Sequence, residues 1–237
     1  MSRMADYARL EQTLTDTLQL TRRPVAVAFL DTPPAGVSRL EGSRPSGCTF
    51  WGMAAEGRIF YTVPADHYNC PIGSYTHNMP LPPEREPELK QTLTLMGEIG
   101  YLRMEEVAGV PQLPKTPAVT IYAPLRATPV DPDVVIVAGT PGGLMLLHET
   151  AARIGTPPVS LLGRPTCMAI PAAMAGGVAS SLGCVGNRVY TGLTDEEFYS
   201  VIRGDRLEPL MNEMATITAA NVMLAEYHRE RAASLTL

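Results

Sequence analysis

The sequence predicts a single α/β (or α+β) domain over residues 1–237, with a mixed β-sheet flanked by helices. Strand-sized apolar runs alternate with segments whose apolar residues recur at helical spacing. A chain of 237 residues with 45% hydrophobic and 18% charged residues can build a large core. Its 22 prolines are nearly twice the usual ~5% and stand mostly between these segments. Stiff connections around a compact scaffold are therefore expected.

The helices are predicted from apolar spacing and glycine stops. In chain order they cover residues 4–20, 48–56, 84–98, a segment ending at Ile154, 167–174 and 207–232. Leu10, Leu14 and Leu18 share one face of the first helix. Gly57 and Gly176 follow the two short helices that begin near cysteines, and glycine is the preferred residue after a helix end.

The strands are predicted where short apolar runs are bounded by Pro, Gly or Asp. They cover residues 25–30, 58–63, 118–123, 134–138, 159–162 and 189–191. The polar segment from His67 to His77 contains Gly and Pro, and we expect it to be a loop that forms a pocket wall.

The four cysteines fall into two similar motifs. Cys48 opens a short helix that a glycine ends, and Cys70 is followed closely by Gly and by Tyr-Thr. Cys167 and Cys184 repeat this order in the second half. The sequence thus predicts a diverged internal duplication, with halves over residues 24–80 and 131–193 and pseudo-twofold symmetry. Such symmetry would bring the two cysteine pairs to one interface.

Charge and hydropathy exclude several classes of protein. The net charge of −5 and the scattered basic residues argue against a nucleic-acid partner. No apolar run approaches the ~18 residues of a membrane helix, and the N-terminus lacks the apolar segment of a secretory signal. We therefore expect a cytoplasmic protein without a membrane partner. Reduced cysteines then suggest metal binding or reactivity before disulfides.

Three local features favour an iron–sulfur cluster, although no two cysteines have zinc-ribbon or ferredoxin spacing. Cys70 is followed by Pro, as at the end of the ferredoxin motif. Cys48 and Cys184 each follow a glycine, which leaves room for a bulky group. Cys48 and Cys167 fall in helix first turns, which favour thiolates.

Other uses of these residues stay open. The thiols could simply fill core space, or form redox-active disulfides, or one of them could be a nucleophile with a base supplied by Asp66, His67 or His77. Arg188, near Cys184, could bind a carboxylate, although a surface role is the simpler interpretation.

These motifs resemble an uncharacterised prokaryotic family, domain of unknown function 169, also called ArCR. The resemblance runs over roughly residues 10–210 and is carried by these segments: Arg23-Pro-Val-Ala-Val, Cys48 with Ala55 and Gly57, Asn69-Cys-Pro-Ile-Gly, Asp131-Pro-Asp-Val-Val and Gly183-Cys-Val-Gly-Asn-Arg. It implies a single-domain cytoplasmic protein of anaerobic prokaryotes, with all four cysteines on motif positions. It implies no substrate.

The leading functional hypothesis is a [4Fe–4S] cluster bound by Cys48, Cys70, Cys167 and Cys184, with His67, His77 and Arg188 in the adjoining pocket. The cluster would transfer electrons to a partner, or act as a redox or Lewis-acid centre on a small molecule. The alternatives are a cofactor-free enzyme with a cysteine nucleophile and a non-enzymatic protein that binds a small ligand such as a tetrapyrrole. A homo-oligomer is compatible with each.

Overall fold

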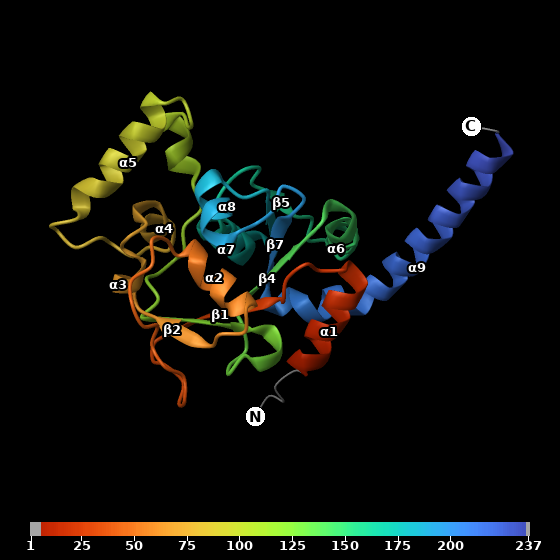
Figure 1. Ribbon diagram of the computed structural model, residues 1–237, viewed down its shortest axis with the longest axis horizontal. Helices are drawn as coiled ribbons and strands as arrows, with labels where there is room; N and C mark the ends of the chain where they lie inside the picture. The colour runs from red at the N-terminus through yellow and green to blue at the C-terminus, as the bar shows by residue number, and fades with distance from the viewer. Residues whose placement is uncertain (1–5, 236–237) are drawn as a thin grey trace.

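Seven strands form one mixed sheet in the computed structural model, which describes residues 6–235 (Figure 1). The strand order is β2-β3-β1-β4-β7-β6-β5, and all neighbouring strands are antiparallel except the parallel pair β5–β6. The strands are β1 (Val25–Leu30), β2 (Phe60–Thr62), β3 (Val119–Pro124), β4 (Val134–Gly139), β5 (Val159–Ser160), β6 (Val178–Ser181) and β7 (Phe198–Arg203). The predicted α/β class is confirmed.

Helices cover both faces of the sheet. They are α1 (Tyr7–Leu18), α2 (Cys48–Ala55), α3 (Pro64–His67), α4 (Pro71–Thr76), α5 (Glu86–Glu98), α6 (Pro141–Arg153), α7 (Thr166–Gly176), α8 (Val185–Thr191) and α9 (Gly204–Ser234). Two 3₁₀ segments, η1 (Met104–Gly109) and η2 (Leu125–Ala127), lie in the connections.

Each face of the sheet has its own hydrophobic core. On one face, Trp51 of α2 and Ile170 of α7 belong to the same buried cluster as Tyr122 of β3. On the other face, α1, α6 and α9 bury leucines such as Leu14 and Leu144. Each fully buried side chain of this size contributes about 1.5–3 kcal/mol of transfer free energy. This first face carries α2 and α7, whose first turns contain Cys48 and Cys167, and α8 and α4 contact these two helices.

The strand order is symmetric about the central pair β1–β4. Moving outward, β1 is followed by β3 and β2, and β4 is followed by β7 and β6. β1 and β4 are antiparallel, with Ala26 opposite Val135. Helix contacts follow the same pattern, since α2 contacts α8 and α4 contacts α7. This arrangement is compatible with the predicted duplication, which stays a prediction.

The segment from His67 to His77 is not the predicted loop. It contains the end of α3 and the whole of α4, each of which begins with a proline. Proline suits the first helical position because its fixed φ is already helical and no N–H is lost. The Asp66 carboxylate also accepts a hydrogen bond from the Val63 N–H at 2.8 Å, which stabilises the start of α3.

The predicted strand at 189–191 is also wrong, because these residues end α8. Val189 has a strand-like side chain, but it is 72% exposed and lies outside the sheet. The sheet contains instead β6 and β7, which the sequence did not reveal. In β6 the small residues Ala179, Ser180 and Ser181 give no apolar run.

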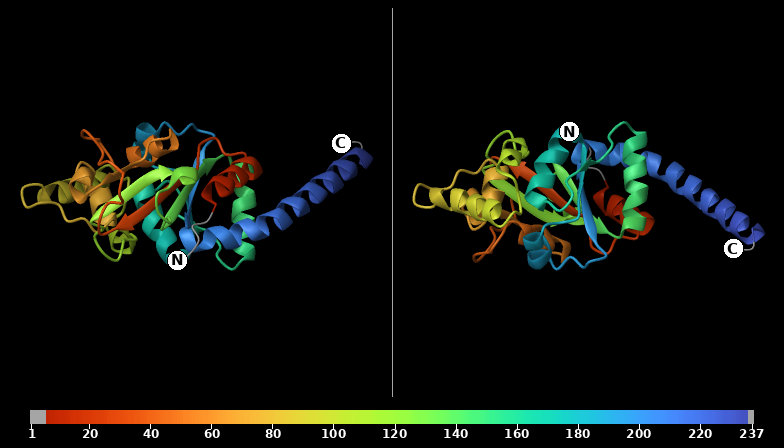
Figure 2. Two further views of the ribbon diagram at one scale, coloured as in Figure 1. Left: turned by 90° about the horizontal axis from the view of Figure 1, so that it is seen from below. Right: turned by 90° about the horizontal axis from the view of Figure 1, so that it is seen from above.

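The longest helix, α9, extends the predicted C-terminal helix at both ends. Its first turns bury Leu207, Leu210 and Met214, and its distal half projects away from the domain (Figure 2). The predicted first helix, 4–20, is observed as Tyr7–Leu18, and residues 4–5 lie outside the described residues. Within residues 6–235, no helix has both the length and the apolarity to cross a membrane.

Candidate functional site

All four cysteines lie at the start of a helix. Cys48 is the first residue of α2 and Cys167 the second residue of α7, and both are buried. Cys70 and Cys184 are the N-cap residues of α4 and α8, and both are half-buried. All four are free thiols. The two halves therefore present their cysteines in the same order and in the same local structure.

Three of the cysteines, Cys48, Cys70 and Cys167, line one cavity, and Cys184 is close enough to interact with them electrostatically. Burial raises the pKa of Cys48, Cys167 and Cys184, and repulsion between neighbouring thiolates adds to it. That repulsion acts on Cys48 from Cys70 and Cys184, on Cys167 from all three others, and on Cys184 from Cys70. Every pair of the four thiols is thus close enough to interact.

This cavity is small. Cys48, Cys70 and Cys167 line it together with Trp51 and His77, and its volume is about 10 Å³. This is space for about one water molecule. Cys184 is not among the lining residues.

Two of the sulfur atoms accept hydrogen bonds from backbone amides. The Gly73 N–H donates to Sγ of Cys70 at 3.3 Å, and the Asn187 N–H donates to Sγ of Cys184 at 3.3 Å. In each helix the donor lies three residues after the cysteine. This is the N-cap arrangement with sulfur in place of oxygen, and it favours the anionic form of the acceptor.

The two buried thiols interact with side chains, in each case including one from the other half of the chain. The side chains of Asn187 and Ser46 lie close to the thiol of Cys48, and the side chain of Thr76 lies close to the thiol of Cys167. These contacts lower the two pKa values, but by less than burial raises them. Polar groups from both halves thus surround the sulfur atoms.

Without a cation, the buried cysteines remain protonated at neutral pH. Burial is the largest cause, and it raises the pKa of Cys48 to about 11. The pKa of Cys167 is raised well above its usual value for the same reason. A bound cation reverses this preference, because a coordinating thiol loses its proton to the solvent.

Gly73 allows α4 and α7 to approach each other at the site. A Cβ atom at this position would lie 3.2 Å from Sγ of Cys70 and 3.8 Å from Cβ of Cys167. The first distance is tighter than ordinary van der Waals contact. The absence of a side chain at Gly73 therefore leaves the space beside two of the thiols.

His67 and His77 are buried beside the thiols and are neutral. Burial lowers the pKa of His67 to about 3 and that of His77 to about 4. Nε2 of His67 lies 2.9 Å from the hydroxyl of Thr62. Nδ1 of His77 lies 2.9 Å from the carbonyl oxygen of Gly73, and since a carbonyl only accepts, Nδ1 carries the proton.

Two polar atoms of the cavity lining have no hydrogen-bond partner among the described residues. They are Nε2 of His77 and the indole Nε1–H of Trp51. Trp51 is 2% exposed and His77 is 3% exposed, so bulk water does not reach these side chains. Unpaired buried polar groups are rare in native proteins, and each calls for a missing partner.

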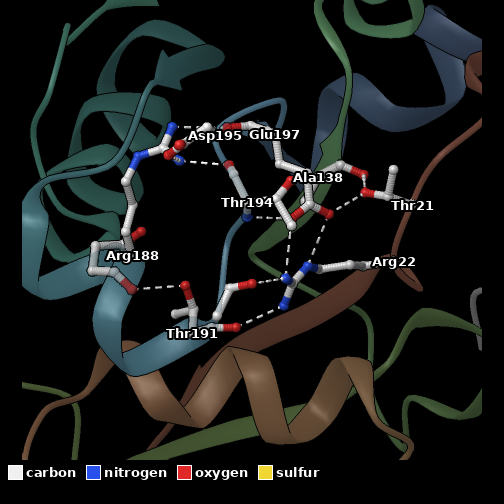
Figure 3. Close-up of polar contacts among 10 residues, drawn as sticks. Thr21, Arg22, Ala138, Arg188, Thr191, Thr194, Asp195 and Glu197 are labelled. Atoms are coloured by element: carbon white, nitrogen blue, oxygen red, sulfur yellow. Dashed lines mark hydrogen bonds and ion pairs between the residues drawn. The ribbon is translucent and has the colours of Figure 1, made fainter.

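Arg188 lies outside this cavity lining, in a polar network at the end of α8. Its guanidinium donates to the carbonyl oxygens of Thr194 and Glu197 (Figure 3). Nearby, Arg22 donates to the carboxylate of Glu197 and to the carbonyl oxygens of Thr191 and Gly192. The network attaches the C-terminal end of α8 to the chain that enters β1.

Glu197 is the centre of the network. Burial raises its pKa, but hydrogen bonds from Arg22, Thr21 and the Thr194 N–H outweigh burial and lower it to about 2. The two ion-pair distances to Arg22 are both 3.1 Å. Glu197 thus stays ionised when the protein is folded, and it holds α8, which carries Cys184 at its start.

Sequence reasoning found the four cysteines and the two histidines but missed their partners. Trp51, Asn187, Ser46, Thr76 and Glu197 were not candidates. One signal was available: Trp51 follows Cys48 by three residues, so both lie on the same side of a short helix. Asn187 bears the same relation to Cys184.

Within residues 6–235, no group of three or more His, Cys, Asp or Glu side chains is positioned to hold a single metal ion.

Among models of known families, the one described as uncharacterised ArCR, domain of unknown function 169, matches residues 13–213. No curated protein and no solved structure matches the chain significantly.

Proposed function

The chain belongs to the ArCR family, whose description names no activity, and we propose from the site itself that it binds an iron–sulfur cluster through Cys48, Cys70, Cys167 and Cys184. The observation that carries the proposal is the grouping of three free thiols, Cys48, Cys70 and Cys167, around one cavity, with Cys184 close enough to interact electrostatically. Four cysteine thiolates are the usual ligand set of a [4Fe–4S] cluster.

The surroundings of the sulfur atoms fit metal-bound thiolates better than buried thiols. Amide N–H groups donate to Cys70 and Cys184, and such bonds stabilise negative charge on sulfur. Burial nevertheless opposes a free thiolate at Cys48 and Cys167. A site that offers donors to sulfur but excludes water is consistent with thiolates whose charge a metal compensates.

Among residues 6–235, no three of these side chains are positioned around a single metal ion. Four irons and four sulfides form a body much wider than one ion, so their thiolate ligands stand farther apart. The cavity of about 10 Å³ is too small for such a body. Cluster binding therefore requires the thiol side chains to turn outward and the helix starts that carry them to move apart.

Electron transfer is the role that this ligand set favours. Four cysteines would occupy all four irons, whereas a catalytic metal usually keeps an open position. The partial exposure of Cys70 and Cys184 gives the centre an edge near solvent, where an electron partner can approach. Chemistry on a small molecule at this edge is the narrower alternative.

The experiment is purification of the full chain under exclusion of oxygen, followed by iron and sulfide analysis. We expect a brown protein with about four irons and four sulfides per chain. The matched variants are Cys48→Ser and Cys167→Ser, which should abolish cluster binding, with Ser160→Ala as the control on an exposed strand. A chain that remains colourless after reconstitution with iron and sulfide would contradict the proposal.

Alkylation of the metal-free chain tests the alternative hypothesis that one cysteine is a catalytic nucleophile. The raised pKa of Cys48 argues against it, because the thiolate is the reactive form. We expect iodoacetamide to modify Cys48 slowly at pH 8 and faster as the pH approaches 11. Rapid modification of one cysteine in a colourless protein would favour the nucleophile instead.

A further inference from the structure

Gly73 lies beside two cysteines that come from different halves of the chain. A Cβ atom at Gly73 would lie 3.5 Å from Cβ of Cys70 and 3.8 Å from Cβ of Cys167. Both cysteines therefore border the space that a side chain at Gly73 would fill. The three atoms nearest to that Cβ position belong to Cys70 and Cys167, and none belongs to Cys48.

We propose that Cys70 and Cys167 form a reversible disulfide when the metal-free chain meets a peroxide. This inference does not rest on the proposed function, because it uses only the free thiols of the chain. A disulfide requires Cβ atoms about 3.5–4.5 Å apart, so the two cysteines need only close the gap beside Gly73. Both cysteines line the cavity of about 10 Å³, and an S–S bond fits such a small space.

The two sulfur atoms are held by helices that contact each other. The Gly73 N–H donates to Sγ of Cys70 at 3.3 Å, which keeps this sulfur against Gly73. Helix α4, which follows Cys70, contacts α7, which carries Cys167. Bond formation therefore joins two elements that are already packed together.

Access from solvent assigns the two roles. Cys70 is half-buried, whereas Cys48 and Cys167 are only 5% and 6% exposed. Cys184 is also half-buried, but it is not among the residues that line the cavity. A peroxide can therefore reach Cys70 first, and Cys167 is the buried thiol that completes the bond.

The reaction consumes one peroxide for each disulfide. Sγ of Cys70 attacks one oxygen of hydrogen peroxide, the O–O bond breaks, one water leaves, and Cys70 becomes a sulfenic acid. Sγ of Cys167 then attacks Sγ of Cys70, the S–S bond forms, and the S–O bond breaks. The hydroxyl group leaves as a second water with the thiol proton of Cys167. Two electrons pass from the thiols to the peroxide, and a dithiol reductant reverses the bond.

The test is treatment of the reduced, metal-free full chain with one equivalent of hydrogen peroxide. Free thiols are then blocked with N-ethylmaleimide, and the chain is digested without reductant for mass spectrometry. We expect the four free thiols to fall to two and the linked peptides to contain Cys70 and Cys167. Cys167 and Cys184 share one tryptic peptide, so chymotrypsin is added to cleave between them at Leu182. A bond from Cys70 to any other cysteine, or no bond, would overturn the inference.

Two cysteine variants separate the pair from its neighbour. Cys70→Ser removes the accessible thiol, so Cys167 should stay reduced at the same dose of peroxide. Cys48→Ser is the matched control, because it removes another cavity-lining thiol and should still form the bond. Oxidation of Cys167 in Cys70→Ser at the wild-type rate would overturn the assigned roles.

Two glycine variants test the gap itself. Gly73→Ala places a methyl group in it, and the bond should form about tenfold more slowly. Gly142→Ala, where an added Cβ meets no atom within 4 Å, should react like the wild type. Circular dichroism checks that both variants are folded, and equal rates in the two would overturn the inference. A wild-type chain that forms the bond but never binds iron would instead refute only the proposed function.

Discussion

The backbone N–H of Asn187, in the first turn of α8, donates a hydrogen bond to Sγ of Cys184 at 3.3 Å. The side chain of the same residue lies close to the thiol of Cys48, at the start of α2, and lowers its pKa. One buried asparagine, 1% exposed, thus lies beside a cysteine from each half of the chain.

Replacement of this side chain should weaken the site. Asn187→Ala removes the 2.7 Å bond to the Thr166 hydroxyl and the polar group that lowers the pKa of Cys48, while the backbone bond to Cys184 remains. We expect a loss of about 1–3 kcal/mol of unfolding free energy and faster loss of iron to a chelator. Asn221→Ala, on the projecting helix, is the control. Equal chelation rates for both variants would contradict this role.

Gly73→Ala should disturb the thiols directly. The added methyl group would lie 3.2 Å from Sγ of Cys70, so either the sulfur or the helix must shift. We expect lower cluster occupancy, measured as iron per chain, with little change in secondary structure. Gly142→Ala is the matched control, because a Cβ there meets no atom within 4 Å. Full occupancy in Gly73→Ala would show that the sulfur position is not critical.

The two buried histidines predict a loss of stability in mild acid. Their pKa values in the folded protein, about 3 and about 4, lie below the ~6.5 of an unfolded histidine. The unfolded chain therefore binds more protons, and stability falls as the pH drops from about 6.5 towards 4. Denaturant unfolding of the metal-free chain at pH 7 and pH 5 measures this. Histidine NMR resonances of His67 and His77 that titrate near pH 6.5 would contradict it.

Glu197 predicts a second acid transition at lower pH. Its pKa of about 2 lies below its usual value of 4.5, so its contribution is complete above about pH 4.5 and is lost as the pH falls towards 2. Glu197→Gln should be less stable at pH 7, and its difference from the wild type should shrink in acid. Glu213→Gln, in a surface pair with Arg153, is the control and should cost less than about 1 kcal/mol. A constant difference between pH 7 and pH 2 would contradict the role of the charge.

The sequence predicted the elements with strong local signals. The apolar runs of β1 and β4 and the cysteine-to-glycine segments of α2 and α7 were all located. Strand β6 was missed because Ala179, Ser180 and Ser181 are small, and they are buried only because α7 contacts them. The helix α8 was mistaken for a strand because Val189 and Tyr190 favour strands, whereas the cap at Cys184 starts a helix.

The sequence indicated the cysteines of the candidate site but not the side chains that surround them. The repeat suggested that Cys48 and Cys167 belong together, and the symmetric strand order agrees with this grouping. The contacts of Asn187 with Cys48 and of Thr76 with Cys167 cross between halves, so no local pattern could reveal them. Similarly, Arg188 was predicted to line the pocket because it follows Cys184 by only four residues in the sequence. Its guanidinium instead donates to the carbonyl oxygens of Thr194 and Glu197.

The wide separation of the four cysteines along the chain would affect how the protein denatures once a centre is bound. A centre bound to all four sulfurs would cross-link the polypeptide between residues 48 and 184, and unfolding could not release that loop until the ligands dissociated. Because loop closure restricts the denatured ensemble, the loaded chain should resist denaturant more than the metal-free chain does. Loss of the centre, by oxidation or chelation, would then set the lifetime of the folded protein.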